Sequence, residues 1–292
     1  MIDLHIHSIC SDGTDNIHTI LSKCEELGLD AISITDHDTI AAYSFIKSPY
    51  PYTGKFISGV EIKTTFAGVP VEVLGYDFDL AMLKDSPCVS VEEKIKIQNK
   101  YLQNYIRVGN ELGILSTEGL KITDSRQYAA TTYYDDIIKY HHNYEVIPEL
   151  LNNKREDFYR QTSGNINSPF YIDESLDSQP IDFVISEIHR CGGLAFLAHL
   201  YQYKGISHID FLQRLFETTD IDGCEAYYTT FTEKQTQSIL EITNLYKKLI
   251  SGGSDYHGKN KKNIELGVGY GNLNIPDITK DWPLIEKIIK KK

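Results

Sequence analysis

The sequence lacks the features that mark several classes of protein. Its five cysteines are scattered along 292 residues and form no Cys-x-x-Cys pair, which argues against a disulfide framework. No apolar run is long enough to span a membrane. A strand predicted from residue 2 onward leaves no room for a signal peptide. We therefore expect reduced thiols and a cytoplasmic protein.

Positive charge is also in short supply. There are 29 basic and 41 acidic residues, which gives a net charge of −12. An acidic body does not favour a broad membrane or nucleic-acid surface, so we expect no membrane association and no stable nucleic-acid complex. Bound divalent ions could still make one pocket locally positive. The hydrophobic content of 41% is ordinary, and the length suffices for a sizeable core.

The first predicted strand carries two histidines on one face. His5 and His7 are two residues apart, and side chains alternate along a strand, so both imidazoles point the same way. Asp12 follows on a turn that contains Gly13 and could fold back over the same end. Imidazole and carboxylate together are ligands for zinc, manganese or iron. The alternative is a strand with one packed and one exposed histidine.

Short strands alternate with helical periodicity at both ends of the chain. This rhythm predicts an α/β fold over residues 1–80 and 181–292. The predicted strands are 2–7, 31–35, 55–62, 71–76, 194–198, 223–227 and 249–251. The predicted helices are 16–28, one beginning at Ile40, 181–191, 206–218, 231–247 and 283–289.

Residues 81–180 do not continue the alternation of strands and helices. A long helix is predicted for 91–113 and a second helical run for 146–151, with Thr, Ser and Tyr clusters between them. We interpret this region as an inserted, mostly helical cap. Its tyrosines could stack on a nucleotide base, but packing is the interpretation we favour for most of them.

Polar residues recur where the predicted strands end. Glu61 and Glu72 are carboxylates inside apolar strands, and a buried carboxylate needs a charge partner or a metal; an exposed strand face is the alternative. In a parallel barrel, strand ends converge on one rim. Eight such residues are too many for one ion and favour a centre of two or three metals, which hydrolyse phosphate esters. They are His5, His7, Asp12, His37, Glu61, His199, Asp255 and His257.

In their order along the chain, these motifs resemble the PHP (polymerase and histidinol phosphatase) family of metal-dependent phosphoesterases. The resemblance covers roughly residues 1–80 and 181–275. The motifs are Asp-x-His-x-His-Ser with Ser-Asp-Gly, Thr-Asp-His-Asp, Gly-Val-Glu, Leu-Ala-His and Gly-Ser-Asp-x-His. Several motifs in order are far more specific than any single one.

The resemblance implies a distorted (β/α)7 barrel with a trinuclear site of divalent Mn, Fe or Zn. One ion would be held by His5, His7, Glu61 and Asp255. Glu61 would bridge to a second ion, which also takes His199, and the third would be held by Asp12, His37 and His257. A bridging hydroxide would be the nucleophile, with His37 and Asp38 orienting water or the leaving group. The inserted cap is typical of the branch that hydrolyses nucleoside phosphates and short oligonucleotides.

The sequence departs from this family in two places. Relatives carry a histidine in Val-His-Ile-Leu-Gly where this chain has Glu72. Glutamate can bind a hard ion, so the second metal site is either kept with a changed preference or lost. A Gly-Arg-Pro-His-like segment that helps to hold the phosphate in the nucleotide branch is missing; the corresponding stretch reads Tyr128-Ala-Ala-Thr-Thr-Tyr-Tyr. This departure leaves the substrate open.

A phosphate substrate needs cations beyond the metals. Lys204 follows His199 and Lys259 follows His257, so both could reach the rim, and Arg160 is a further candidate in the cap. Each could instead be an ordinary solvated side chain.

The sequence favours hydrolysis of a phosphate monoester or terminal phosphodiester in a small phosphorylated substrate. Three alternatives stay open. The same chemistry could act on histidinol phosphate, or the chain could be a non-catalytic PHP module. A metal-dependent hydrolase of C–N bonds ranks last, because amidohydrolase barrels use similar His-x-His strands with a different ligand order.

Overall fold

The computed structural model describes residues 1–283, and the chain divides into two compact units. The barrel unit comprises residues 1–90 together with the segment from 178 onward, and the inserted unit comprises residues 91–177. The helix predicted for residues 283–289 falls almost wholly outside the described residues. No described helix is both long and apolar enough to cross a membrane.

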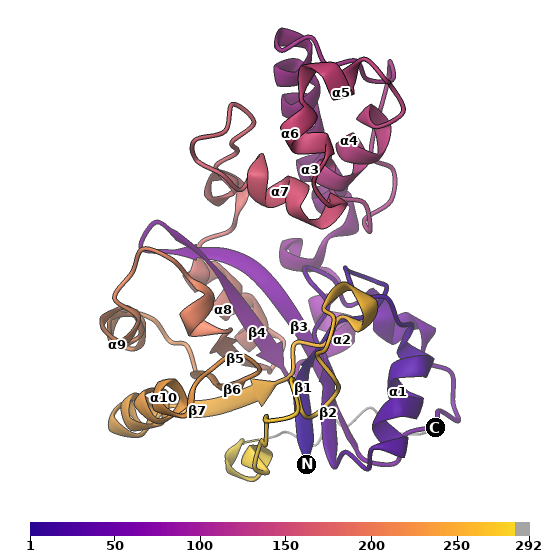
Figure 1. Ribbon diagram of the computed structural model, residues 1–292. Coiled ribbons are helices and arrows are strands. Elements are labelled where there is room, and N and C mark those ends of the chain that lie inside the picture. Colours follow the sequence, from indigo (N-terminus) through magenta and orange to yellow (C-terminus); the bar gives the residue numbers. More distant parts are fainter. Residues whose placement is uncertain (284–292) are drawn as a thin grey trace. The chain divides into compact units, whose positions relative to one another are not determined.

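Seven strands form one sheet in the barrel unit, in the order of the sequence (Figure 1). Neighbouring strands are parallel except around β4, which runs antiparallel to both β3 and β5. This mixed α/β barrel confirms the predicted fold class. The strands are β1 (Ile2–Ile6), β2 (Ala31–Ile34), β3 (Lys55–Phe66), β4 (Val69–Tyr76), β5 (Leu194–Leu197), β6 (Gly223–Tyr228) and β7 (Leu249–Gly253).

A two-residue hairpin reverses β4. Ala67 and Gly68 connect β3 to β4, and both have positive φ, 52° and 78°. Two consecutive residues of this kind make the turn whose twist matches that of paired strands. Because β4 runs backwards, its first half lies beside the second half of β3, and Glu72 pairs with Lys63. Glu72 therefore reaches the rim where the other strands end.

The sheet closes between its first and last strands. The segment after β7 returns beside β1: the His7 amide donates to the Tyr256 carbonyl at 2.9 Å, and the Asp255 amide donates to the His5 carbonyl at 2.8 Å. Closure brings residues from the two ends of the barrel unit onto one rim.

Helices cover the outside of this sheet (Figure 1). In α1 (Ile17–Glu26) the Asn16 side chain accepts from the Thr19 amide at 3.0 Å, and Gly28 ends the helix with φ of 64°. The helix predicted from Ile40 is a short 3₁₀ turn, η1 (Ala41–Phe45). The other helices of the unit are α2 (Leu80–Leu83), η2 (Pro87–Val89), α8 (Ile181–Arg190), η5 (Leu200–Gln202), α9 (His208–Thr218), α10 (Glu233–Tyr246), η6 (Gly258–Asn260) and η7 (Ile278–Asp281).

The inserted unit is helical and has its own core. Buried aromatic rings form its centre: Tyr105 packs on Tyr133 and Phe170 at centroid distances of 5.2 and 5.4 Å. Its helices are α3 (Val91–Glu111), α4 (Ala129–Ile137), α5 (Asn143–Val146), α6 (Pro148–Leu151), η3 (Arg155–Asp157), α7 (Phe158–Gln161) and η4 (Glu174–Asp177). Helix α4 was not predicted from the sequence, in which its residues form only a threonine and tyrosine cluster.

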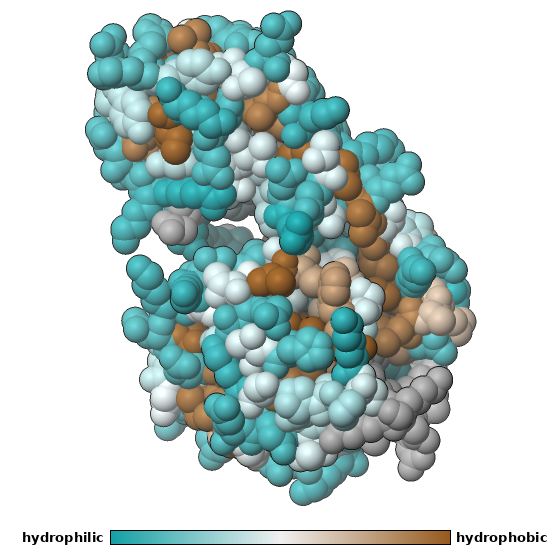
Figure 2. All heavy atoms as spheres, turned by 90° about the vertical axis from the view of Figure 1, so that its right-hand side faces the viewer, coloured by the Kyte–Doolittle hydropathy of each residue, from teal (hydrophilic) through white to brown (hydrophobic). Residues whose placement is uncertain are grey.

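Hydrophilic side chains cover most of the face shown in Figure 2. Among the described residues, the most exposed large hydrophobic side chains are Leu176, Ile166 and Leu245. Single exposed hydrophobic residues are normal on protein surfaces.

Candidate metal centre

The first strand places two imidazoles side by side. His5 and His7 are both fully buried, and their Nε2 atoms lie 3.1 Å apart. Like-facing nitrogens this close are natural ligands of one ion. The alternative of one packed and one exposed histidine is wrong.

Glu61 lies at the centre of the cluster. Its Oε2 is 3.2 Å from the Nε2 atoms of both His5 and His7, and its Oε1 is 2.8 Å from His199 Nε2. Its side chain is 1% exposed, which rules out the exposed strand face. Each carboxylate oxygen faces a different set of histidines, so Glu61 is placed to hold two ions at once.

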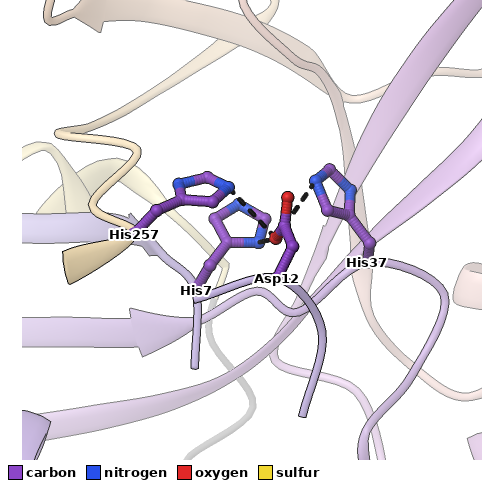
Figure 3. A group of neighbouring side chains, drawn as sticks. All are labelled: His7, Asp12, His37 and His257. Carbon is purple, nitrogen blue, oxygen red and sulfur yellow. Dashed lines mark ion pairs between the residues drawn. The ribbon is translucent and has the colours of Figure 1, made fainter. Parts of the chain in front are cut away.

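A second group gathers around Asp12 (Figure 3). Asp12 Oδ1 lies 3.1 Å from His257 Nε2, 3.7 Å from His7 Nδ1 and 3.8 Å from His37 Nε2. The three imidazoles come from different segments and converge on one carboxylate, as Figure 3 shows. Distances of this size between donor atoms leave room for a shared ion.

Glu72 reaches the same cluster from the reversed strand. Its Oε1 is 3.3 Å from His37 Nδ1 and its Oε2 is 3.2 Å from His199 Nε2. The carboxylate is therefore present at the position where we expected either a changed ligand or a lost site.

The cluster fits divalent metals by its donor set. Nitrogen and carboxylate oxygen atoms form four overlapping sets, and the donor atoms of each set lie within 4.8 Å of one another. Together the sets contain all nine residues that the sequence analysis named as metal ligands. The sets are His7, Asp12, His37 and His257; His5, His7 and Asp255; His5, Glu61 and His199; and His37, Glu61 and Glu72.

Charge at the cluster is strongly coupled. Burial favours a neutral His7, but hydrogen bonds to Asp255 and Glu61 raise the pKa of His7 to about 9. Burial opposes charge on His199 as well, yet Glu61 and Glu72 raise its pKa to about 10. Burial also disfavours the Asp12 carboxylate, but His37 and His257 hold the pKa of Asp12 well below its ordinary value. The carboxylates of the cluster thus stabilise positive charge close to them. Protons on the histidines supply that charge here, and divalent ions would supply it in their place.

Glu225 on β6 supports two of these ligands from outside. Its Oε1 accepts from His5 Nδ1 at 2.9 Å, and its Oε2 accepts from the His199 amide at 2.8 Å. With Nδ1 donating, His5 turns Nε2 toward the cluster. Glu225 was not predicted as a functional residue, although it is a carboxylate in an apolar strand, as Glu61 and Glu72 are.

Asp3 fastens the segment that carries Asp255. Its carboxylate accepts from the Ser254 amide at 2.9 Å, from Ser254 Oγ at 2.6 Å and from the Gly267 amide at 2.7 Å. Burial raises the pKa of Asp3, although these hydrogen bonds counteract the effect. The first aspartate of the Asp-x-His-x-His motif therefore joins β1 to the segment after β7.

The remaining predicted residues lie apart from the four donor sets. Asp38 has φ of 51°, and its Oδ1 accepts from the Lys63 amide at 2.9 Å. Lys204 and Lys259 are exposed, and Arg160 is an exposed residue of the inserted unit. Lys261, which the sequence analysis did not consider, forms an ion pair with Asp255.

Comparison with known sequences identifies the family. The sequence profile named PHP domain matches residues 3–266. The chain belongs to the PHP domain family. This membership confirms the family of metal-dependent phosphoesterases that was named from the motifs.

Two curated relatives match most of this chain. A 5′-3′ exoribonuclease of Haemophilus influenzae is 25% identical over 260 residues, which are 87% of this chain and 89% of the relative. A phosphoribosyl 1,2-cyclic phosphate 1,2-diphosphodiesterase of Eggerthella lenta is 26% identical over 266 residues, 88% of this chain and 94% of the relative.

Solved structures share the fold. A presumed metal-dependent phosphoesterase of Bifidobacterium adolescentis is similar with a TM-score of 0.65 and 23% identity, over 96% of this chain and 94% of that one. An amidohydrolase of Chromobacterium violaceum, solved with sulfate and no metal, is similar with a TM-score of 0.64 and 17% identity, over 95% and 92%.

Proposed function

We propose that this PHP protein cleaves a phosphate ester of a nucleotide, or the terminal ester of a short oligonucleotide, with two or three divalent ions. The observation that carries the proposal is the position of Glu61. Its two oxygens face separate histidine sets, so two ions bound there would be close neighbours.

Different residues of the chain would hold each of the three ions. His5, His7, Glu61 and Asp255 would hold the first ion, and Glu61, Glu72 and His199 the second. Asp12, His37 and His257 would hold the third. Ions in such centres lower the pKa of a bound water and balance charge on phosphoryl oxygens. His37, besides holding the third ion, and its neighbour Asp38 would orient the water or the leaving group.

The proposed substrate class rests on charge and on the relatives. The names of both curated relatives refer to phosphate esters that contain ribose. A net charge of −12 repels a long polyanion, so a small substrate whose phosphate reaches the ions is favoured.

The test is hydrolysis by protein loaded with manganese. The panel comprises a 5′-phosphorylated RNA dinucleotide, a nucleoside monophosphate and histidinol phosphate. We expect His7→Ala and Glu61→Ala to lower kcat/KM for the best substrate by about 100-fold or more, because loss of an outer-shell partner alone costs 10–100-fold. Chelation should abolish turnover. His141→Ala, which removes an exposed imidazole of the inserted unit, is the control and should be unchanged.

Other outcomes would replace this proposal. Turnover of histidinol phosphate alone would select the histidinol-phosphatase alternative. Stoichiometric metal without hydrolysis of any ester would select the non-catalytic module. Wild-type rates in both variants would refute metal catalysis at this cluster.

A further inference from the structure

Lys261 places an ammonium group at the edge of the metal centre. It follows η6 and lies six residues after Asp255, and its Nζ forms an ion pair with Asp255 Oδ2. An ammonium group carries only donors, so Lys261 itself would not be a ligand of the ions.

The loop that carries Lys261 is held in place. The Thr14 amide donates to the His257 carbonyl at 3.2 Å, and the Lys259 amide donates to Thr14 Oγ1 at 2.9 Å. The Asn260 side chain donates to the Asp12 carbonyl at 2.6 Å. These bonds tie the loop to the segment that presents Asp12, so Lys261 is directed back toward the donor cluster.

Asp255 uses its two oxygens differently. Oδ1 faces the cluster, 3.3 Å from His7 Nε2 and 3.5 Å from His5 Nε2. Oδ2 faces away and accepts from the Tyr228 hydroxyl at 2.7 Å. The outer oxygen therefore receives one hydrogen bond from Tyr228 besides its ion pair with Lys261.

The ammonium group of Lys261 has more N–H donors than the described part of the chain provides acceptors for. An ammonium group carries three N–H bonds, and Asp255 is the one hydrogen-bond acceptor that the described part of the chain provides for it. Its side chain is 37% exposed, so a ligand can approach it from solvent.

We propose that Lys261 binds an oxygen of the substrate's phosphate group at the metal centre. The inference rests on the proposed function, because it assumes that a phosphate ester is the ligand of the ions. A lysine ammonium is a point charge that suits phosphate. Of the cations considered for this role, Lys261 is the one paired with a residue of the donor sets.

The experiment measures phosphate binding rather than turnover. Inorganic phosphate is titrated by calorimetry into manganese-loaded wild type, Lys261→Met, Lys261→Arg and Lys262→Met, with manganese content determined for each. We expect Lys261→Met to weaken phosphate binding at least 10-fold with its manganese content intact, and Lys261→Arg to keep most of the affinity. Lys262→Met, which changes the exposed lysine next to Lys261, should bind within 2-fold of wild type.

Three outcomes would overturn the inference. The first is wild-type phosphate affinity in Lys261→Met, and the second is a wild type that binds no phosphate. The third is loss of manganese from Lys261→Met, which would mean that the lysine positions Asp255 instead. Because binding needs no turnover, a protein that binds phosphate through Lys261 but hydrolyses no ester would refute the proposed function and leave this inference standing.

Discussion

Glu225 shows how a single side chain outside the cluster sets the geometry of the ligands. Both of its partners, His5 Nδ1 and the His199 amide, are hydrogen-bond donors, and each is given its own carboxylate oxygen. His199 follows β5 with φ of 23°, a conformation that needs support from its surroundings. One carboxylate therefore aligns ligands from two strands.

Glu225→Gln should weaken metal binding by about 10–100-fold. The amide keeps the size of the side chain but has one oxygen, so either His5 or the His199 amide would face an NH₂ group. Competition with a chelator, followed by elemental analysis, measures the affinity.

A matched control is Asp136→Asn in the inserted unit. Asp136 is also buried and accepts from the Thr117 amide and hydroxyl at 2.7 and 2.6 Å. That variant should lose stability and keep its metal affinity. If Glu225→Gln bound metal as tightly as wild type, Glu225 would have no part in aligning the ligands.

The residues named from sequence share a visible signal. Glu225, which was missed, carries the same signal as Glu61 and Glu72, whereas Lys261 carries none. His5 and His7 were predicted by their spacing, and the other ligands by motifs at strand ends. Lys261 carries no such signal, because its role depends on a loop folding back onto the segment around Asp12. A lysine in a polar loop looks solvated until that contact is known.

At the scale of elements, the contact between β1 and β7 closes the barrel. A Cβ atom added at Gly253 would lie 2.3 Å from both the Cβ and the backbone nitrogen of His5. The two strands approach this closely because β7 ends in glycine. Strand closure and the position of His5, the first proposed metal ligand, therefore both depend on Gly253.

Gly253→Ala should separate the strands, lower the free energy of unfolding by about 3 kcal/mol and reduce the metal content. Gly28→Ala is the control: nothing lies within 4 Å of its added Cβ, and its φ of 64° should cost about 1 kcal/mol. Urea unfolding and elemental analysis distinguish the two. Full metal content in a stable Gly253→Ala protein would show that the strands tolerate the methyl group.

Helices and strands were predicted well where the hydrophobic pattern of the segment itself determines them, and poorly where it does not. The buried strands and α1 follow from pattern and caps. The reversal of β4 was missed, because its signal is only the pair Ala67-Gly68, and alanine rarely adopts positive φ. The 3₁₀ turn η1 was predicted as the start of a longer helix, because the spacing of its apolar residues matches that of a first helical turn.

For the molecule as a whole, the metal centre concentrates negative charge in an already acidic chain. Four carboxylates, Asp12, Glu61, Glu72 and Asp255, lie among its nine proposed ligands. The chain's single tryptophan, Trp282, reports on the same unit, because its ring packs on Tyr76 and Phe196 of the barrel. Tryptophan fluorescence therefore follows unfolding of the barrel unit.

Stability of the metal-stripped protein should fall as pH rises. The pKa values of His7 and His199 are raised from 6.5 to about 9 and about 10, because protonated imidazoles pair with the carboxylates. This stabilisation is complete below pH 6.5, where the unfolded chain is protonated too, and it is lost as pH passes through 9 and 10. Ions bound to neutral imidazoles replace those protons and add stability by mass action.

We therefore expect Tm, followed by tryptophan fluorescence, to drop by about 5 °C or more between pH 6.5 and 9.5 in chelated protein, since 1 kcal/mol corresponds to roughly 2–4 °C at this size. Protein loaded with manganese should change much less, so the gap between the two forms should widen with pH. A gap that stays constant would mean that the histidines are neutral in the stripped protein, and that the carboxylates find their counter-charge elsewhere. Glu61→Gln separates the two cases, because it removes a carboxylate that raises both pKa values and should flatten the pH dependence of the stripped form only if the histidines are its source.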